Sequence, residues 1–255
     1  MAFGIGRKQK EVVTTKQDGS LATAEERTIT TEVGENAPAR VYLQPIAAPS
    51  ILGLYGFAGA TFIVAAGLAG WYGSATGAPL YLFPFAAFFG GLAQFLAGMW
   101  SYRARDGLAT AMHGMWGSFW MAYGLLYLLF ATGTLTPPTG AFPELGFWFI
   151  ALAAITWVGT WAATAVNKML VGVLGFLSAG STVMAIAQLT GNVPLTEIAG
   201  WLFLIAAVLA WYLASALMLE SVFGAEVLPV GPNEHAREAP SIAVGLGEPG
   251  VMHGQ

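Results

Sequence analysis

Residues 198–219 read IAGWLFLIAAVLAWYLASALML, a stretch that contains no Asp, Glu, Lys or Arg. The hydrocarbon core of a bilayer is about 30 Å thick, and a helix needs about 20 apolar residues to cross it. This stretch is therefore long and apolar enough to form a transmembrane helix, and the rest of the chain can be compared with it.

Five other stretches of the chain have the same character. With residues 198–219 they give six predicted spans: Ile51–Trp71, Tyr81–Tyr102, Leu108–Thr132, Leu145–Val166, Met169–Leu189 and Ile198–Leu219. The whole chain is 56% hydrophobic and 9% charged, whereas a soluble domain usually has about 25% charged residues. We therefore predict an all-α membrane protein in which six transmembrane helices form a bundle.

The two ends of the chain differ from this apolar middle. The first forty-odd residues are rich in Thr, Glu and Lys and poor in aromatic residues, which is typical of disorder. They contain no apolar core of a signal peptide behind their basic start. The last residues combine Pro, Gly and charge. We predict a disordered tail over residues 1–46, a six-helix domain over residues 47–228 and a second disordered tail over residues 229–255.

The basic residues are distributed unevenly around the predicted spans. All ten Lys and Arg lie in the two tails, after the second span or between the fourth and fifth spans: Arg7, Lys8, Lys10, Lys16, Arg27, Arg40, Arg103, Arg105, Lys168 and Arg237. Cytoplasmic loops carry an excess of Lys and Arg. We predict a multi-pass protein of the plasma (inner) membrane with both termini in the cytoplasm.

Small and polar residues inside the spans are the first candidates for a special role. Ala86, Gly90, Gln94 and Gly98 recur every four residues, so they share one helix face, and small residues allow close helix packing in lipid. Gln94 fits either an interhelical hydrogen bond or the lining of a pore. His113 is the one His, Asp, Glu, Lys or Arg inside any span. Ionisable residues there suggest function, although a neutral His can also bond to a backbone carbonyl.

Several classes of function are not favoured by the sequence. The chain has no cysteine, which excludes a disulfide framework, a thiolate metal site and a Cys nucleophile. Its three histidines, His113, His235 and His253, are too scattered for a zinc site. It has no nucleophile–base pair and no phosphate-binding loop, and a net charge of −4 does not favour nucleic acid. We expect no enzyme, no cofactor, no metal and no nucleic-acid partner.

Residues 48–57 read APSILGLYGF, and three later motifs follow in order: GGLAQFLAG at 90–98, WGSFW at 116–120, and AGW at 199–201 with FGAEVLPVG at 223–231. The first stretch resembles the signature of the acetate uptake transporter family, the succinate–acetate permeases, which is Asn-Pro-Ala-Pro-Leu-Gly-Leu followed by x-Gly-Phe. The signature falls on Ala48, Pro49, Leu52, Gly53 and Leu54. Ala48 replaces the signature Asn, so a good helix N-cap is lost.

This resemblance implies a function and an assembly. Members of that family are six-helix proteins that form hexamers, with a path through each protomer, and they move acetate and in some cases succinate. A hydrophobic constriction is made by a Phe, a Tyr and a Leu, and the resemblance places these at Phe57, Trp116 and Ala179. Trp is larger than Tyr and Ala is smaller than Leu, so we expect the two changes to compensate in a ring of similar aperture.

Helix geometry is compatible with such a path. With a rise of 1.5 Å per residue, Phe57, Gln94, Trp116 and Ala179 can share one depth in the membrane. The start of the first span offers backbone N–H groups to a carboxylate. We therefore predict three path-lining or substrate-binding residues and one candidate proton site. The path-lining residues are Ser50, Leu54 and Gln94, and the proton site is His113.

The predicted function is the passage of small monocarboxylates, chiefly acetate, in a proton-linked or channel-like way. Its partners would be a small carboxylic acid, protons, the lipid bilayer and further copies of the chain in a hexamer. One alternative is a channel for small neutral solutes such as ammonia or urea, because a ring without fixed charge suits them too. Another is a membrane signalling or scaffold protein in which the Thr-rich first tail is the working part.

Overall fold

The structure is a computed structural model, and it describes residues 46–73 and 82–232. Most of the two predicted tails lies outside these residues. Six helices in the described part are long and apolar enough to cross a membrane. The predicted all-α fold with six spans is therefore confirmed.

The six spans follow one another along the chain. The first is α1 (Pro49–Leu68), and the second is built from α2 (Phe83–Phe85), the π-helix η2 (Ala86–Ala93) and α3 (Gln94–Ala104). The remaining four are α4 (Gly107–Ala131), α5 (Pro143–Ala163), α6 (Lys168–Thr190) and α7 (Val193–Phe223). Because each span crosses the bundle once, residues 105–106, 164–167 and 224–232 lie at one end, which we call the Asp106 end.

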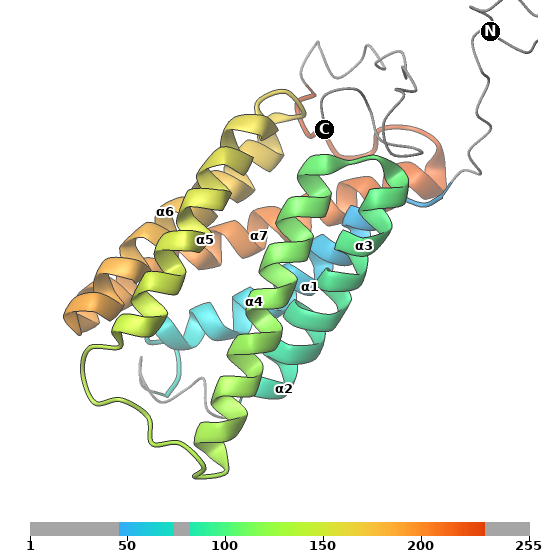
Figure 1. The fold of residues 1–255 in the computed structure, drawn as a ribbon. Helices are drawn as coiled ribbons and strands as arrows, with labels where there is room; N and C mark the ends of the chain where they lie inside the picture. Colours follow the sequence, from blue (N-terminus) through green and yellow to red (C-terminus); the bar gives the residue numbers. More distant parts are fainter. Residues whose placement is uncertain (1–45, 74–81, 233–255) are drawn as a thin grey trace, which may run out of the picture. The chain divides into compact units, whose positions relative to one another are not determined.

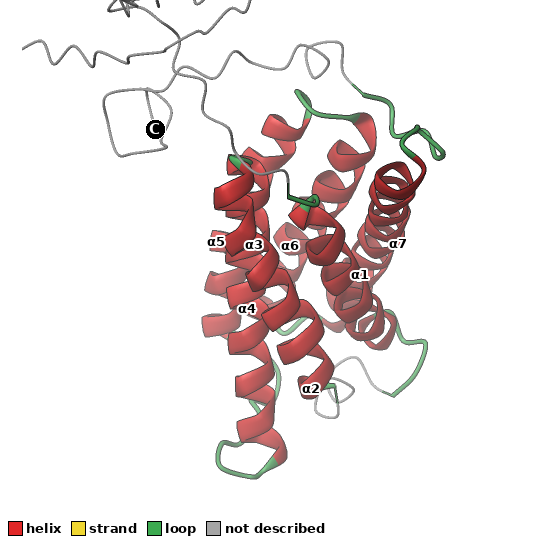
Figure 2. Cartoon of the chain, turned by 90° about the vertical axis from the view of Figure 1, so that its right-hand side faces the viewer, coloured by secondary structure: helices red, strands yellow, loops and turns green. Residues whose placement is uncertain are grey.

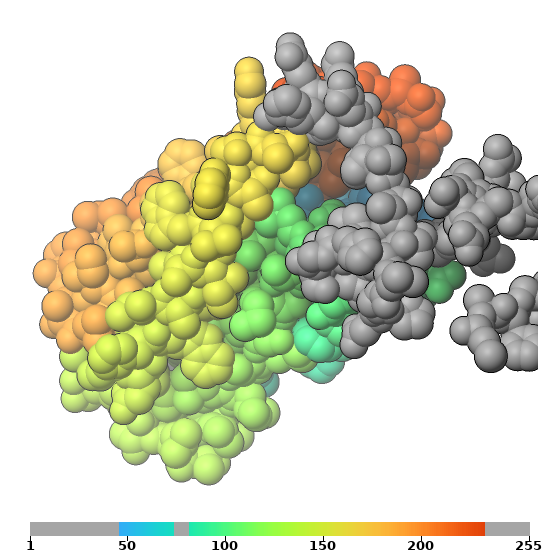
Figure 3. Space-filling model, turned by 45° about the horizontal axis from the view of Figure 1, so that its top comes forward, coloured from blue at the N-terminus to red at the C-terminus, as the bar shows by residue number. Residues whose placement is uncertain are grey.

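The helices pack in neighbouring pairs around a common core. α5 packs along α6, α7 packs against both α6 and α1, and α3 packs against α4 (Figure 1). Figure 2 shows the pair of α1 and α7 next to the other helices. The face drawn in Figure 3 is formed largely by α4, α5 and α6, coloured green through orange. The bundle therefore brings α1, α4, α6 and α7 around one interior.

Three helices begin at a polar residue that caps them. The side chain of Asp106 accepts a hydrogen bond from Ala109 N at 2.8 Å, and Asn167 accepts one from Leu170 N at 2.7 Å. Asn192 does the same for Leu195 N at 3.1 Å. Such caps satisfy N–H groups that have no partner in the first turn of a helix. The cap at Asn192 starts α7 five residues before the predicted Ile198.

The second span is less regular than its sequence suggested. Its middle is a π-helix, a rare form that occurs frequently at functional sites. The four residues of the small stripe, Ala86, Gly90, Gln94 and Gly98, are all buried. A Cβ added at Gly56 of α1 would lie 2.5 Å from the carbonyl oxygen of Phe89. The predicted close packing of small residues is therefore observed, and it presses α1 against η2.

The chain after α7 folds back onto the start of α6. The N–H of Lys168 donates to Gly231 O at 3.0 Å, and the N–H of Met169 donates to Val230 O at 3.2 Å. The hydroxyl of Tyr212 donates to Pro229 O at 2.9 Å. Residues 229–232 were predicted to belong to the second tail, but these contacts join them to the helical bundle. Backbone carbonyls of this segment satisfy first-turn N–H groups of α6.

Candidate functional site

The interior of the bundle contains a cavity near the Asp106 end. It has a volume of about 200 Å³ and is lined by residues of α1, α3, α4, α6 and α7. We call it the His113 cavity. Its lining includes most of the residues predicted from the sequence: Ala48, Ser50, Leu54, Phe57, Gln94, His113 and Trp116. The structure therefore brings together side chains from three of the predicted spans.

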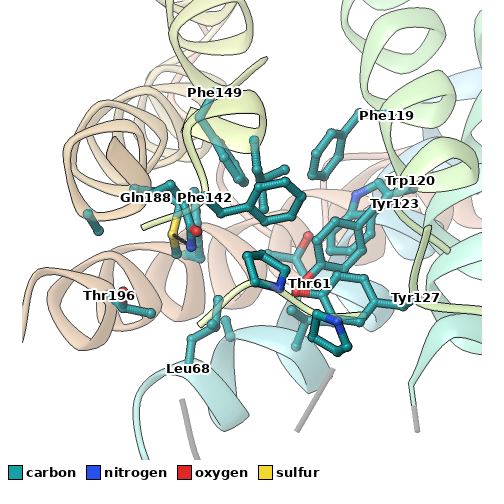
Figure 4. Close-up of a pocket in the computed structure, with 18 of the residues that line it drawn as sticks. Thr61, Leu68, Phe119, Trp120, Tyr123, Tyr127, Phe142, Phe149, Gln188 and Thr196 are labelled. Atoms are coloured by element: carbon teal, nitrogen blue, oxygen red, sulfur yellow. Dashed lines mark hydrogen bonds between the residues drawn. The ribbon is translucent and has the colours of Figure 1, made fainter. Parts of the chain in front are cut away.

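A second cavity, also of about 200 Å³, lies toward the opposite end of the bundle. We call it the Tyr123 cavity, and Figure 4 shows it as a chamber surrounded by aromatic rings. The labelled rings that face it are Phe119, Trp120, Tyr123, Tyr127, Phe142 and Phe149. Thr61, Gln188 and Thr196 add polar groups to the lining, which includes no Lys, Arg, Asp or Glu from the described part of the chain. The chamber is therefore apolar, with a few neutral polar groups.

Two side chains, Trp116 and Leu177, line both cavities. They are buried, with 2% and 3% of their surface exposed. The ring of Phe57 meets the ring of Trp116 edge-on, with centroids 6.4 Å apart, on the side of the His113 cavity. Together these residues form the junction, an apolar partition between the two chambers.

One residue of the predicted ring lies away from both cavities. Ala179 is half-buried and lines neither cavity. Two residues along an α-helix correspond to a rotation of about 200°, so Leu177 and Ala179 point in nearly opposite directions. The junction thus contains Leu177 and does not contain Ala179.

His113 is packed tightly at the wall of its cavity. A Cβ added at Gly53 would lie 2.5 Å from ring atoms of His113, so this glycine gives the imidazole its space. The Nε2 of His113 lies 3.3 Å from the Oγ of Ser50, at the start of α1. Nδ1 has no hydrogen-bond partner among the described residues. His113 therefore bonds to a side chain of α1, and the backbone-carbonyl contact considered as an alternative is not seen.

Gln94 also lines the His113 cavity and is 3% exposed. Its Oε1 has no hydrogen-bond partner within the described residues. An interhelical hydrogen bond was one of two interpretations of this residue, and in the structure Gln94 is at the cavity wall instead. A buried amide oxygen without a partner is costly and suits a position where polar solutes pass.

The remaining signature residues support α1. Ala48 precedes α1 without a side-chain cap, and Pro49 occupies its first turn. Leu52 is 48% exposed and lines neither cavity. Sequence reasoning missed Leu177 and Asp106, which line the His113 cavity, and the aromatic chamber beyond. In residues 46–73 and 82–232 no group of three or more His, Asp and Glu is placed to hold a metal ion.

The chain matches known proteins over most of its length. The GPR1/FUN34/yaaH family matches residues 32–231. The succinate-acetate/proton symporter SatP of Escherichia coli (strain K12) is 30% identical over 188 residues, which cover 73% of this chain and 96% of SatP. The ammonia transport outward protein 2 of Saccharomyces cerevisiae is 32% identical over 186 residues, which cover 71% of this chain and 64% of that protein.

A solved structure agrees with these relatives. The structure of the bacterial acetate channel SatP matches with a TM-score of 0.67 and 27% sequence identity, and the match covers 73% of this chain and 100% of that chain. The relatives are transporters or channels and not enzymes, as expected from the sequence. Six spans and a transporter family make this a multi-pass membrane protein that acts in transport. The chain belongs to the GPR1/FUN34/yaaH family, which confirms the resemblance to the succinate–acetate permeases.

Proposed function

We propose that the protein passes small monocarboxylates, chiefly acetate, through the two cavities of each protomer, in a proton-linked or channel-like way. The observation that carries this proposal is the pair of chambers that share Trp116 and Leu177 as a common wall. The names of the bacterial relatives, a succinate-acetate/proton symporter and an acetate channel, support the choice of substrate.

The constriction of this path is the ring of Phe57, Trp116 and Leu177. All three side chains are apolar at the cavity surface and at most 3% exposed. Hydrophobic constrictions exclude hydrated ions, because water leaves a narrow apolar passage. The methyl group of acetate fits such a ring, whereas a large or strongly hydrated solute does not.

The carboxyl group needs compensation inside the membrane, where an uncompensated charge costs several kcal/mol. We assign this role to the start of α1, whose first N–H groups and dipole face an anion favourably. Ser50 and Gln94, both in the lining of the His113 cavity, add hydrogen-bonding groups. Among the described residues that line the two cavities there is no Lys or Arg, so we expect weak binding and fast passage.

His113 is the proposed proton site of the path. It lines the cavity that contains Gln94, and Ser50 is its one hydrogen-bond partner among the described residues. Asp106, the N-cap of α4, is the other ionisable side chain among the described residues of that lining. In a proton-linked mode His113 takes up the proton that accompanies the acid, and in a channel-like mode it stays neutral.

The orientation follows the basic residues. We assign the Asp106 end, near Arg103, Arg105 and Lys168, to the cytoplasm of a plasma (inner) membrane. The His113 cavity then faces inward and the Tyr123 cavity faces outward. Assembly as a hexamer, with one path in each protomer, stays a prediction from the family resemblance.

A channel for small neutral solutes is the second candidate function. It is favoured by the yeast relative, an ammonia transport outward protein with 32% identity, and by the lack of charged side chains among the described residues that line the Tyr123 cavity. Ammonia could pass an apolar ring as readily as a small acid. The signalling or scaffold alternative concerns the first tail, which lies outside the described residues.

The test is flux through the purified protein in liposomes. Labelled acetate, propionate, lactate and succinate are compared with ammonia, which is followed by an internal pH dye. We expect saturable acetate flux well above that of empty liposomes, and a loss of flux on Phe57→Trp, which fills the ring. Leu52→Trp is the matched control, because Leu52 is exposed and lines neither cavity. Ammonia flux without acetate flux would contradict the proposal and establish the second candidate.

A further inference from the structure

Trp116 is held in the junction by contacts on several sides. Its ring meets the ring of Phe57 edge-on, with centroids 6.4 Å apart, and the ring of Phe119 with centroids 5.4 Å apart. These two rings restrict how far the indole can tilt. They do not fix its rotation, because edge-on aromatic contacts tolerate a range of angles.

A hydrogen bond fixes the remaining freedom. The Nε1–H of Trp116 donates to the Oγ1 of Thr156 on α5 at 3.0 Å. An indole nitrogen can only donate, and this is the side-chain hydrogen bond that the structure gives Trp116. The hydroxyl of Thr156 in turn donates to Leu152 O at 2.6 Å, so its lone pair faces the indole.

Thr156 itself does not line either cavity. It is fully buried, with 0% of its surface exposed, behind the Trp116 ring. One turn further along α5, a Cβ added at Gly159 would lie 2.6 Å from the Sδ of Met112 on α4. The two helices are therefore in close contact here, and the hydroxyl has a fixed position relative to α4.

We propose that Thr156 is a positioning residue, which holds the Trp116 indole across the junction and thereby determines which carboxylic acids pass. The inference rests on the proposed function. Trp116 lines both cavities, so in this proposal a solute that moves from one cavity to the other displaces its indole. Displacing the indole breaks its bond to Thr156. Longer acids need a wider opening, so the bond opposes their passage more than that of acetate.

The experiment compares butyrate with acetate in the liposome flux assay. Thr156→Val keeps the shape of the side chain and removes the acceptor. We expect the ratio of butyrate flux to acetate flux to rise about threefold to tenfold, the range of one net hydrogen bond. Thr156→Ser keeps the hydroxyl and should keep the wild-type ratio.

Thr160→Val is the matched control on the same helix. Thr160 lies one turn from Thr156 and bonds to Thr156 O and Ser178 Oγ, both at 2.8 Å. Thr160 makes no hydrogen bond to Trp116, so removing its hydroxyl group should leave the ratio of butyrate flux to acetate flux unchanged. An equal change in Thr156→Val and Thr160→Val would mean a general loosening of α5 and would overturn the proposal.

A coupling measurement separates positioning from a structural role. In a Trp116→Phe background there is no indole N–H, and adding Thr156→Val should then have no further effect on the ratio. The same effect in both backgrounds would overturn the proposal. If Thr156→Val does not fold, Thr156→Cys replaces it, since a thiol is a weak acceptor. An unchanged ratio of butyrate flux to acetate flux in Thr156→Cys would also overturn the proposal. Failure of the wild type to carry acetate would instead refute the proposed function.

Discussion

The imidazole of His113 packs against α1 at Gly53, and its Nε2 lies within hydrogen-bonding distance of the hydroxyl of Ser50. Gln keeps a polar group at this position but cannot take up a proton near neutral pH. We expect His113→Gln to remove the pH dependence of acetate uptake that remains after correction for the ionisation of acetate itself. The measurement is the initial rate of labelled acetate uptake in liposomes at each pH.

Ser50→Ala provides the control for His113→Gln, because it removes the contact of the imidazole and leaves the ring ionisable. Acetate uptake by the Ser50→Ala variant should still depend on pH. A His113→Gln profile identical to that of the wild type would exclude the residue from proton coupling.

Leu177 and Ala179 offer a direct test of which residue of α6 forms the ring. Leu177→Ala removes part of the common wall of the two cavities, so propionate and butyrate flux should rise several-fold. Ala179→Val should change neither flux, because Ala179 lines neither cavity. The readout is the flux of each acid in liposomes. If Ala179→Val changes the flux of these acids more than Leu177→Ala does, then Ala179 forms the ring, as expected from the sequence.

At the scale of elements, the contact between α3 and α4 depends on one of two facing glycines. A Cβ added at Gly98 would lie 2.6 Å from Gly114 N, whereas a Cβ at Gly114 would meet nothing within 4 Å. Gly98→Ala must therefore push the two helices apart. We expect it to lower the free energy of unfolding by about 1–3 kcal/mol, as overpacking does in protein cores. Gly114→Ala should be neutral or stabilising by up to about 1 kcal/mol, because Ala favours the helix.

The two glycine variants are compared by thermal unfolding in detergent. Both add the same methyl group to a transmembrane helix, so any difference reports the contact and not the composition. Equal melting temperatures would mean that α3 and α4 do not approach each other as closely as described.

At the scale of the whole molecule, six crossings place the two ends of the bundle on opposite sides of the membrane. The chain contains no cysteine, so single cysteines can be labelled without a background. Thr139 and Ser221 are both exposed and lie at opposite ends. We expect a membrane-impermeant maleimide added to intact cells to label Thr139→Cys and to leave Ser221→Cys unlabelled until the membrane is opened. The reverse pattern would invert the proposed orientation.

The number and type of the spans could be predicted because they are local properties. About 20 apolar residues without charge must form a helix in lipid, where backbone groups find no water. The motifs were also local, so the family and several lining residues, among them Phe57, Gln94 and Trp116, followed from the sequence. The same reasoning placed Ala179 in the ring and did not identify Leu177, because a helix that is apolar on all sides has no periodic pattern that reports its rotation.

The number of membrane crossings and the family of this chain could therefore be inferred from its amino-acid sequence alone. Which side chains meet inside the bundle became clear only from the three-dimensional arrangement of the helices. It selected Leu177 for the junction, placed Thr156 behind Trp116 and joined residues 229–232 to the start of α6. These features depend on how helices are rotated and pressed together, and close packing among small residues, not hydrophobic burial, governs that choice in lipid.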